Sequence, residues 1–154
     1  MIIVSACLAG VNCKYDGGNN LNPRIKDMVA RGLALPVCPE QLGGDPTPRE
    51  PVELSGRSGE DVLDGRGRAV TNTGRDKTDS FIRGAHEVLK IARLVNAEYA
   101  ILKERSPSCG SGLIYDGTFT GRRCKGHGVT AALLERHGIK VYSEEEDYPF
   151  SRRP

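Results

Sequence analysis

Cysteines are the residues of this chain with the most distinctive chemistry. They occupy five positions: Cys7, Cys13, Cys38, Cys109 and Cys124. The number is odd and too small for a disulfide framework, so metal binding or catalysis is the expected use of these thiols in a reducing compartment. Thiolates prefer soft metals such as zinc and iron–sulfur clusters. The sequence has no CxxC pair of the kind found in zinc ribbons and ferredoxins, so cysteine spacing alone does not identify a metal.

Three of the cysteines follow apolar runs that are predicted to be strands. They are Cys7 after residues 2–5, Cys38 after residues 33–37, and Cys109 after residues 97–103. The carboxyl ends of parallel strands meet at one edge of a sheet, where ligands bind, so we expect these thiols to converge. Cys13 lies in the loop after the first strand and can reach the same edge. Three thiolates and an open metal position predict a catalytic centre, and four predict a closed structural site. The remaining alternative is that all are small buried side chains.

Polar side chains in the same loops are candidates for catalysis. Glu40 lies two residues after Cys38 and could give or take a proton, or it is a solvated loop carboxylate. Ser106 and Ser108 could donate hydrogen bonds to a substrate or a cluster sulfide, or they serve the turn around Pro107.

Other residues near the cysteines also have a functional and an ordinary interpretation. Tyr15 lies in the glycine-rich stretch KYDGGNN, which could bind a small polar ligand or form a simple turn. Lys103 and Arg105 would add positive charge near a metal site, or they face water. His127 lies between glycines and could approach a site, but the sequence does not require it.

Two kinds of pattern predict the elements that position these residues. Apolar side chains from Phe81 to Val95 recur every three or four positions, which predicts a helix with one buried face, capped by Thr78 or Asp79. The proline- and glycine-rich residues 38–51 predict a loop. The other expected elements are a helix at 23–31 capped by Asn22, hairpins at 52–71 (around DGRG) and 112–121 (turning at Asp116-Gly117), a helix at 129–137 closed by Gly138, and a strand at 139–143.

The alternation of strands and helices predicts the fold class. A chain of 154 residues fits one compact domain. We expect an α/β fold, a single-domain three-layer sandwich with a mainly parallel, Rossmann-like sheet and helices on both faces. Residues 1–146 are expected to form this domain and residues 147–154 a polar C-terminal tail, with the chain loosely held from Glu144 onward.

Composition excludes several other classes of protein. The formal net charge of +2 is too small to predict binding to a nucleic acid polymer. No apolar run approaches the roughly 20 residues that cross a membrane. The apolar N-terminus is short and lacks a basic segment, so we interpret it as a strand rather than a secretion signal and expect a cytoplasmic protein.

Several motifs in order along the chain resemble one known family. They are SACLAG, CKYDGG, CPEQLGG, SPSCG, IYDGTFTG and GHGVTAALL, followed by SEEE, and they span about residues 1–146. Together they are similar to the bacterial thiouracil desulfidase family, of the TudS type. The resemblance implies an enzyme that removes sulfur from thiolated nucleobases such as thiouracil, a small substrate, without net redox change.

The resemblance also implies a cofactor and site residues. A [4Fe-4S] cluster would be held by Cys7, Cys38 and Cys109, and its fourth iron would take the sulfur of the substrate. Glu40 and Ser106 fall on positions associated with proton transfer and substrate activation. Cys13 matches a further family cysteine, whose role the resemblance does not fix: it is either a fourth ligand or a spare thiol. Cys124 lies outside the motifs. The oligomeric state is not predicted.

Two other functions remain as alternatives. The first is a non-catalytic metal- or sulfur-binding module, in which Cys13 closes a site of four cysteines. The second, weaker alternative is thiol redox chemistry that uses Cys7 and Cys13 without a metal.

Overall fold

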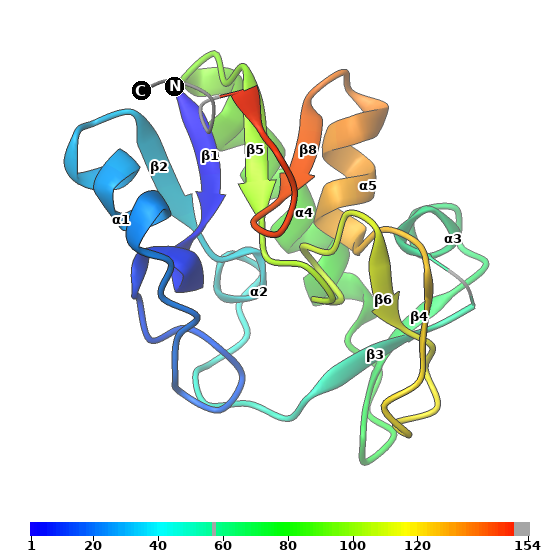
Figure 1. Cartoon of the computed structure of the whole chain (residues 1–154). Coiled ribbons are helices and arrows are strands. Elements are labelled where there is room, and N and C mark those ends of the chain that lie inside the picture. Colours follow the sequence, from blue (N-terminus) through cyan, green and yellow to red (C-terminus); the bar gives the residue numbers. More distant parts are fainter. Residues whose placement is uncertain (57, 150–154) are drawn as a thin grey trace.

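A four-stranded parallel sheet forms the centre of the computed structural model, which describes residues 1–56 and 58–149 (Figure 1). Its strands, in spatial order, are β2 (Ala34–Val37), β1 (Ile2–Ser5), β5 (Tyr99–Leu102) and β8 (Lys140–Ser143). All the neighbouring strands of this sheet pair in parallel. The predicted α/β fold with a parallel, Rossmann-like sheet is confirmed. Pro36 is tolerated because β2 is an edge strand.

Helices cover both faces of this sheet. The helical elements are the 3-10 turn η1 (Ala6–Ala9) and the α-helices α1 (Pro23–Ala30), α2 (Pro39–Leu42), α3 (Gly59–Leu63), α4 (Thr78–Leu94) and α5 (Val129–Arg136). Ile3 belongs to a core with α4 and α5, whereas its neighbour Val4 belongs to a core with Ile25 of α1. Successive strand residues point to opposite faces, so both faces of the sheet are buried.

The ends of the helices follow the sequence signals in two of three cases. The Asn22 side chain accepts hydrogen bonds from the amides of Arg24 and Ile25 at the start of α1, as predicted. Gly138, with a φ of +81°, follows α5. At α4 the predicted cap is wrong. Thr78 is the first helical residue, and its hydroxyl instead accepts a hydrogen bond from the amide of Ala69.

The apolar stripe of α4 is buried as predicted. Its buried members are Phe81, Ala85, Val88, Leu89 and Ala92.

The predicted loop at 38–51 contains one turn of helix, α2, so this prediction is wrong for residues 39–42. Glycine contacts explain the difference. A Cβ atom on Gly43 would overlap the carbonyl oxygen of Ser80, and one on Gly84 would overlap that of Pro39. The two glycines therefore let α2 pack directly on α4, which holds the residues of α2 beside the end of β2.

Two antiparallel hairpins lie below the sheet, but their turns differ from the predictions. β3 (Val52–Ser55) pairs with β4 (Arg68–Thr71) across a connection that contains α3. β6 (Leu113–Tyr115) pairs with β7 (Arg123–Lys125) across residues 116–122. The expected tight turn at Asp116-Gly117 does not form, because the Glu53 side chain accepts the amide hydrogens of Gly117 and Phe119.

The chain after β8 is held more firmly than predicted. The Glu144 carboxylate accepts a hydrogen bond from the Glu104 amide at 2.8 Å. Tyr148 is buried in the core beside α1. The prediction of a loose chain from Glu144 is therefore wrong up to Tyr148, and residues 150–154 of the predicted tail lie outside the described residues.

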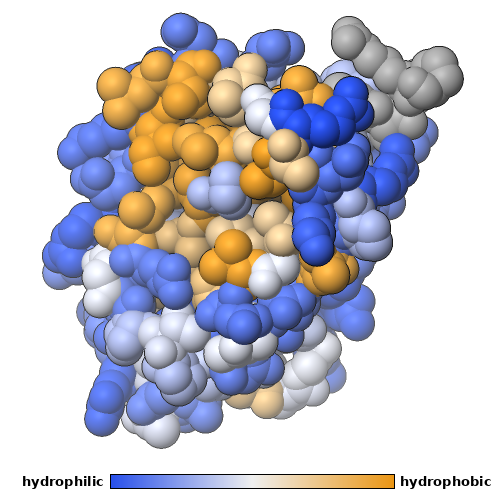
Figure 2. All heavy atoms as spheres, turned by 90° about the vertical axis from the view of Figure 1, so that its left-hand side faces the viewer, coloured by the Kyte–Doolittle hydropathy of each residue, from blue (hydrophilic) through white to orange (hydrophobic). Residues whose placement is uncertain are grey.

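The free edge of β2 lies on the face shown in Figure 2, where apolar side chains gather in the upper part and hydrophilic ones in the lower part.

Within the described residues no helix is long and apolar enough to span a membrane.

Candidate functional site

A cavity of about 590 Å³ lies at the edge of the sheet where β1, β2 and β5 end. The predicted site residues on its wall are Cys7, Cys13, Cys38, Glu40, Ser106 and Cys109. Cys7 lies in η1 directly after β1, and Cys38 directly precedes α2. Thus the three thiols that follow strands do converge, and Cys13 joins them. Cys124 lies on β7 and is not part of the cavity wall.

The thiols of Cys7, Cys13 and Cys38 interact with one another. Hydrogen bonding from Cys13 lowers the pKa of Cys7 to about 7 and that of Cys38 to about 6, against burial, which raises both. The same contacts raise the pKa of Cys13, which keeps its proton. Because Cys13 carries a single thiol proton, it stabilises one of the two thiolates at a time.

Cys109 is chemically different from these three. Its side chain is buried, and burial raises its pKa, with a smaller opposing effect from a hydrogen bond with Ser5. Negative charge on Cys7 and Cys38 raises the pKa of Cys109 further. A metal that binds Cys109 must therefore displace its proton.

The set of donors fits an iron–sulfur cluster. No group of three or more His, Cys, Asp or Glu side chains within residues 1–56 and 58–149 has the spacing for one metal ion. Four thiols on the wall of one cavity fit an iron–sulfur cluster, because thiolates are its usual ligands.

The loop that carries Cys109 is folded around the carboxylate of Glu104. One oxygen of this carboxylate accepts hydrogen bonds at 3.1 to 3.2 Å from the amides of Arg105, Ser111, Gly112 and Leu113. Glu104 is only 8% exposed. The sequence analysis missed this role, although an acidic residue before a loop rich in serine and glycine amides is a usable signal.

Ser106 and α5 fix the middle of this loop. The Ser106 hydroxyl oxygen accepts hydrogen bonds from the amides of Ser108 and Cys109, which leaves its own proton free to donate. The carbonyl oxygen of Ser108 accepts the amide of Thr130 in the first turn of α5. A Cβ on Gly128 would overlap the backbone of Ser108, so the close contact requires glycine there.

Glu40 of α2 is a largely buried carboxyl on the cavity wall. Burial raises its pKa, and the nearby Arg49 guanidinium partly offsets this effect. Arg49 Nε lies 3.2 Å from Glu40 Oε1 in an ion pair whose side chains are 8% and 14% exposed. A hydrogen bond with Ser108 also lowers the pKa of Glu40, to a smaller extent. The alternative of a solvated carboxylate is therefore wrong.

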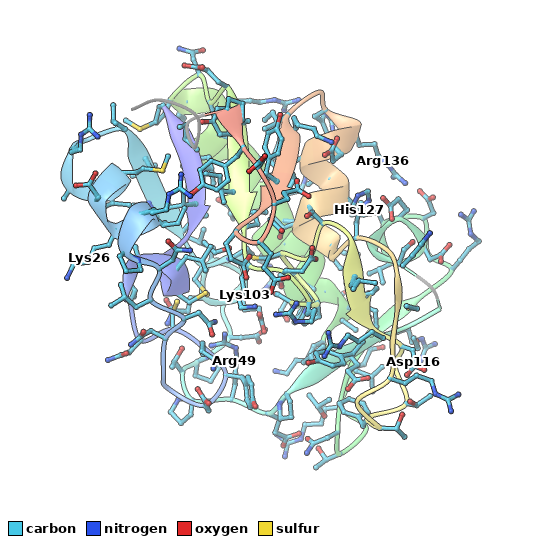
Figure 3. All side chains as sticks on the ribbon, in the orientation of Figure 1. Lys26, Arg49, Lys103, Asp116, His127 and Arg136 are labelled. Carbon is cyan, nitrogen blue, oxygen red and sulfur yellow. The ribbon has the colours of Figure 1, made fainter. Side chains whose placement is uncertain are left out.

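Arg49 is the second residue that the sequence analysis missed. Arg49 lines the cavity, and Figure 3 shows it below the parallel sheet. The sequence signal for this residue is weak, since a single arginine in a proline-rich loop is usually solvated. The other candidates are less central. Lys103 and Arg105 line the cavity but are paired with Glu144 and Glu145.

Tyr15 lines the cavity, and it is 46% exposed. His127 instead pairs with Glu60 of α3, and it is not part of the cavity wall.

Comparisons with known proteins identify one family. The family model described as 2-thiouracil desulfurase matches residues 2–146. A Bacillus subtilis (strain 168) protein, described as uncharacterized protein YbbK, is 50% identical over 146 residues, which cover 95% of this chain and 97% of that protein. A solved structure named [4Fe-4S]-dependent thiouracil desulfidase TudS is 46% identical, with a TM-score of 0.82 over 94% of this chain and 90% of that chain. The chain therefore belongs to the 2-thiouracil desulfurase family, as its motifs predicted.

Proposed function

We propose that this protein is a [4Fe-4S]-dependent thiouracil desulfidase. In this reaction thiouracil and water give uracil and hydrogen sulfide, so atoms and electrons balance without an external oxidant or reductant. The observation that carries the proposal is the convergence of Cys7, Cys38 and Cys109 on one cavity in a chain of this family. A cavity of about 590 Å³ has the size of a site for a small molecule such as a thiolated base.

In this proposal Cys7, Cys38 and Cys109 hold the cluster. A cluster with three protein ligands would supply an iron that lacks a protein ligand and acts as a Lewis acid toward sulfur. The lowered pKa values of Cys7 and Cys38 support their role, because the hydrogen bond from Cys13 favours a thiolate at this pair near neutral pH. Cys13 is then a neighbour that donates its thiol proton rather than a ligand.

Glu40 and Ser106 act on the substrate and on water. The raised pKa of Glu40 brings its proton exchange closer to neutral pH, so it can accept a proton from the attacking water and return it to the leaving sulfur. The Ser106 hydroxyl, oriented by two backbone amides, can donate a hydrogen bond to a ring atom as negative charge develops there.

Anaerobic reconstitution of the wild type and of Cys109→Ala tests the proposal. The wild type should contain iron and sulfide in cluster proportion and convert 2- or 4-thiouracil to uracil, and Cys109→Ala should lose both properties. Cys124→Ala is the matched control, because this cysteine is not on the cavity wall, and it should behave as the wild type. An intact cluster with no turnover of any thiolated base would contradict the enzymatic proposal.

The contact of Cys13 with Cys7 and Cys38 favours a second candidate, a non-catalytic site closed by four cysteines. In that case Cys13→Ser should lose the metal as completely as Cys7→Ser does. Retention of iron and sulfide by Cys13→Ser would exclude the closed site.

A further inference from the structure

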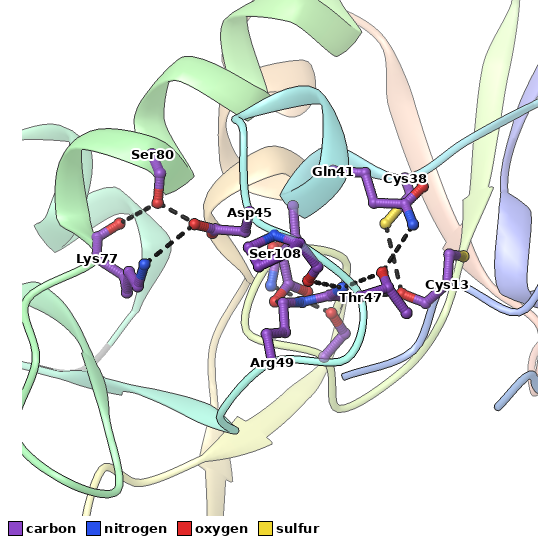
Figure 4. Close-up of polar contacts among 12 residues, drawn as sticks. Cys13, Cys38, Gln41, Asp45, Thr47, Arg49, Lys77, Ser80 and Ser108 are labelled. Atoms are coloured by element: carbon purple, nitrogen blue, oxygen red, sulfur yellow. Dashed lines mark hydrogen bonds and ion pairs between the residues drawn. The ribbon is translucent and has the colours of Figure 1, made fainter. Parts of the chain in front are cut away.

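Arg49 connects the loop of Cys13 with α2 and with residues 46–47 of its own loop (Figure 4). Its Nη2 donates to the carbonyl oxygen of Cys13 at 2.8 Å, and its Nε to Glu40 of α2 at 3.2 Å. Its Nη1 donates to the Thr47 hydroxyl at 2.8 Å and to the carbonyl oxygen of Pro46 at 3.1 Å. A guanidinium with five donors in a planar fork can serve these acceptors together, whereas the single nitrogen of lysine cannot reach all of them.

Arg49 makes the closer of two side-chain contacts with the carbonyl oxygen of Cys13. Its Nη2 lies 2.8 Å from this oxygen, whereas Cys38 Sγ lies 3.8 Å from it. The backbone amide of Arg49 adds a further bond to the same loop, since it donates to the carbonyl oxygen of Tyr15 at 2.7 Å.

We infer that Arg49 is a positioning residue of the desulfidase site. Its guanidinium holds the carboxylate of Glu40 on the cavity wall and closes the loop of Cys13 to Tyr15 against α2. The inference rests on the proposed function, because it assigns Arg49 a role through the proton-transfer residue of that reaction.

Kinetics of Arg49→Gln, Glu40→Gln and the double variant test the action through Glu40. After anaerobic reconstitution, Arg49→Gln should lower kcat for 2-thiouracil by about ten- to a hundredfold and change KM far less. In the Glu40→Gln background the same substitution should change kcat by less than about twofold, because the residue through which it acts is already lost. A wild-type kcat in Arg49→Gln, or effects that multiply in the double variant, would overturn the inference.

Arg83→Gln is the matched control. Arg83 also binds the end of α2, since its Nη1 donates to the carbonyl oxygen of Gly43 at 2.9 Å, but it does not line the cavity. A general loosening of α2 would affect both variants, so the control should keep kcat within about twofold of the wild type if the loss is specific to Arg49. An equal loss of kcat in both variants would contradict a specific role.

Alkylation of cluster-free protein tests the loop closure without any turnover. Cys13 is 3% exposed, so its labelling by iodoacetamide, followed by mass spectrometry, reports opening of the loop. Arg49→Gln should raise the rate of Cys13 labelling by about fivefold or more, and Arg83→Gln should leave it unchanged. Unchanged labelling in Arg49→Gln would disprove the closure.

Two further outcomes keep the tests separate from the proposed function. If the wild type does not convert thiouracil, the proposed function fails, while the labelling result still decides the loop closure. If Arg49→Gln does not fold, the same measurements of kcat and of Cys13 labelling are made on Arg49→Lys. Lysine keeps the charge but cannot serve all the acceptors, so kcat should fall and Cys13 labelling should rise. Wild-type values of both for Arg49→Lys would overturn the inference.

Discussion

The two walls of the cavity are held together in opposite ways. On the wall that carries Cys109, the Glu104 carboxylate accepts four backbone amides from within its own loop. On the wall that carries Cys38, Arg49 donates to acceptors in the Cys13 loop, in α2 and in its own loop. A loop whose backbone amides point inward needs an acceptor for their hydrogen bonds, and a carboxylate provides one. Carbonyl and carboxylate oxygens of separate segments need a shared donor, and a guanidinium provides several N–H groups that point in different directions. Local hydrogen bonds therefore hold the Cys109 wall in shape. The shape of the Cys38 wall depends on contacts between segments that lie far apart in the sequence.

Loss of Glu104 should have the largest effect on stability. Glu104→Ala leaves four amides of a partly buried loop without their acceptor, so the free energy of unfolding should fall by about 2 to 4 kcal/mol. Urea denaturation of cluster-free protein measures it. Glu53→Ala is the control, because Glu53 serves only the Gly117 and Phe119 amides in a more exposed hairpin and its loss should be smaller. Equal losses in the two variants would remove the contrast between the walls.

Gly84→Ala should have the next largest effect, on the wall of Cys38. The added methyl group overlaps the carbonyl oxygen of Pro39 and must push α2 away from α4, at a cost of about 1 to 3 kcal/mol. The midpoint temperature of thermal unfolding should decrease, and so should the iron content after reconstitution. Lys90→Ala, an exposed substitution on the same helix, should change stability by less than about 0.5 kcal/mol. A fully stable Gly84→Ala would show that α2 is not docked so closely.

The thiols of the two walls should differ in reactivity. At pH 7 in cluster-free protein, Cys7 and Cys38 should be alkylated faster than Cys109, because the pKa of each is lowered and that of Cys109 is raised. Cys13→Ala removes the hydrogen bond to the thiolates, so both lowered pKa values rise and labelling at pH 7 slows by about three- to tenfold. The difference between wild type and variant should shrink as the pH rises past about 9, where the thiols of the variant begin to ionise as well, and the labelling rate of Cys124 should not change. A rate for Cys7 and Cys38 that is insensitive to Cys13 would contradict the thiol contacts.

The smallest effect on stability is expected for a partly exposed ion pair of the Cys109 loop. Arg105 forms a bidentate ion pair with Glu145, with side chains 25% and 49% exposed. Solvent screens such a pair, so Arg105→Gln should cost less than about 1 kcal/mol in urea denaturation, and the cost should shrink at high salt. A double-mutant cycle with Glu145→Gln isolates the pair. A coupling energy above about 2 kcal/mol would show that this pair contributes to stability on the same scale as the contacts of Glu104.

Much of the fold could be predicted because its signals are local. The stripe from Phe81 to Ala92 identified α4, and Asn22 identified the start of α1. The turn of helix at α2 was missed, because it depends on a contact between Gly43 and α4 that no local pattern reports. The two hairpins were predicted with wrong turns for the same reason, since a distant carboxylate, Glu53, holds one of the connections.

The sequence by itself determined the family, the parallel sheet and the cysteines at the ends of its strands, because motifs, periodicity and residue type are all written along the chain. Only the tertiary structure decided that Cys13 lies between Cys7 and Cys38, that Glu40 is buried, and that Arg49 and Glu104 hold the two walls. The physical reason is that burial and hydrogen-bond partners depend on segments far apart in the sequence. A charged residue in a loop looks solvated until the fold shows which groups surround it.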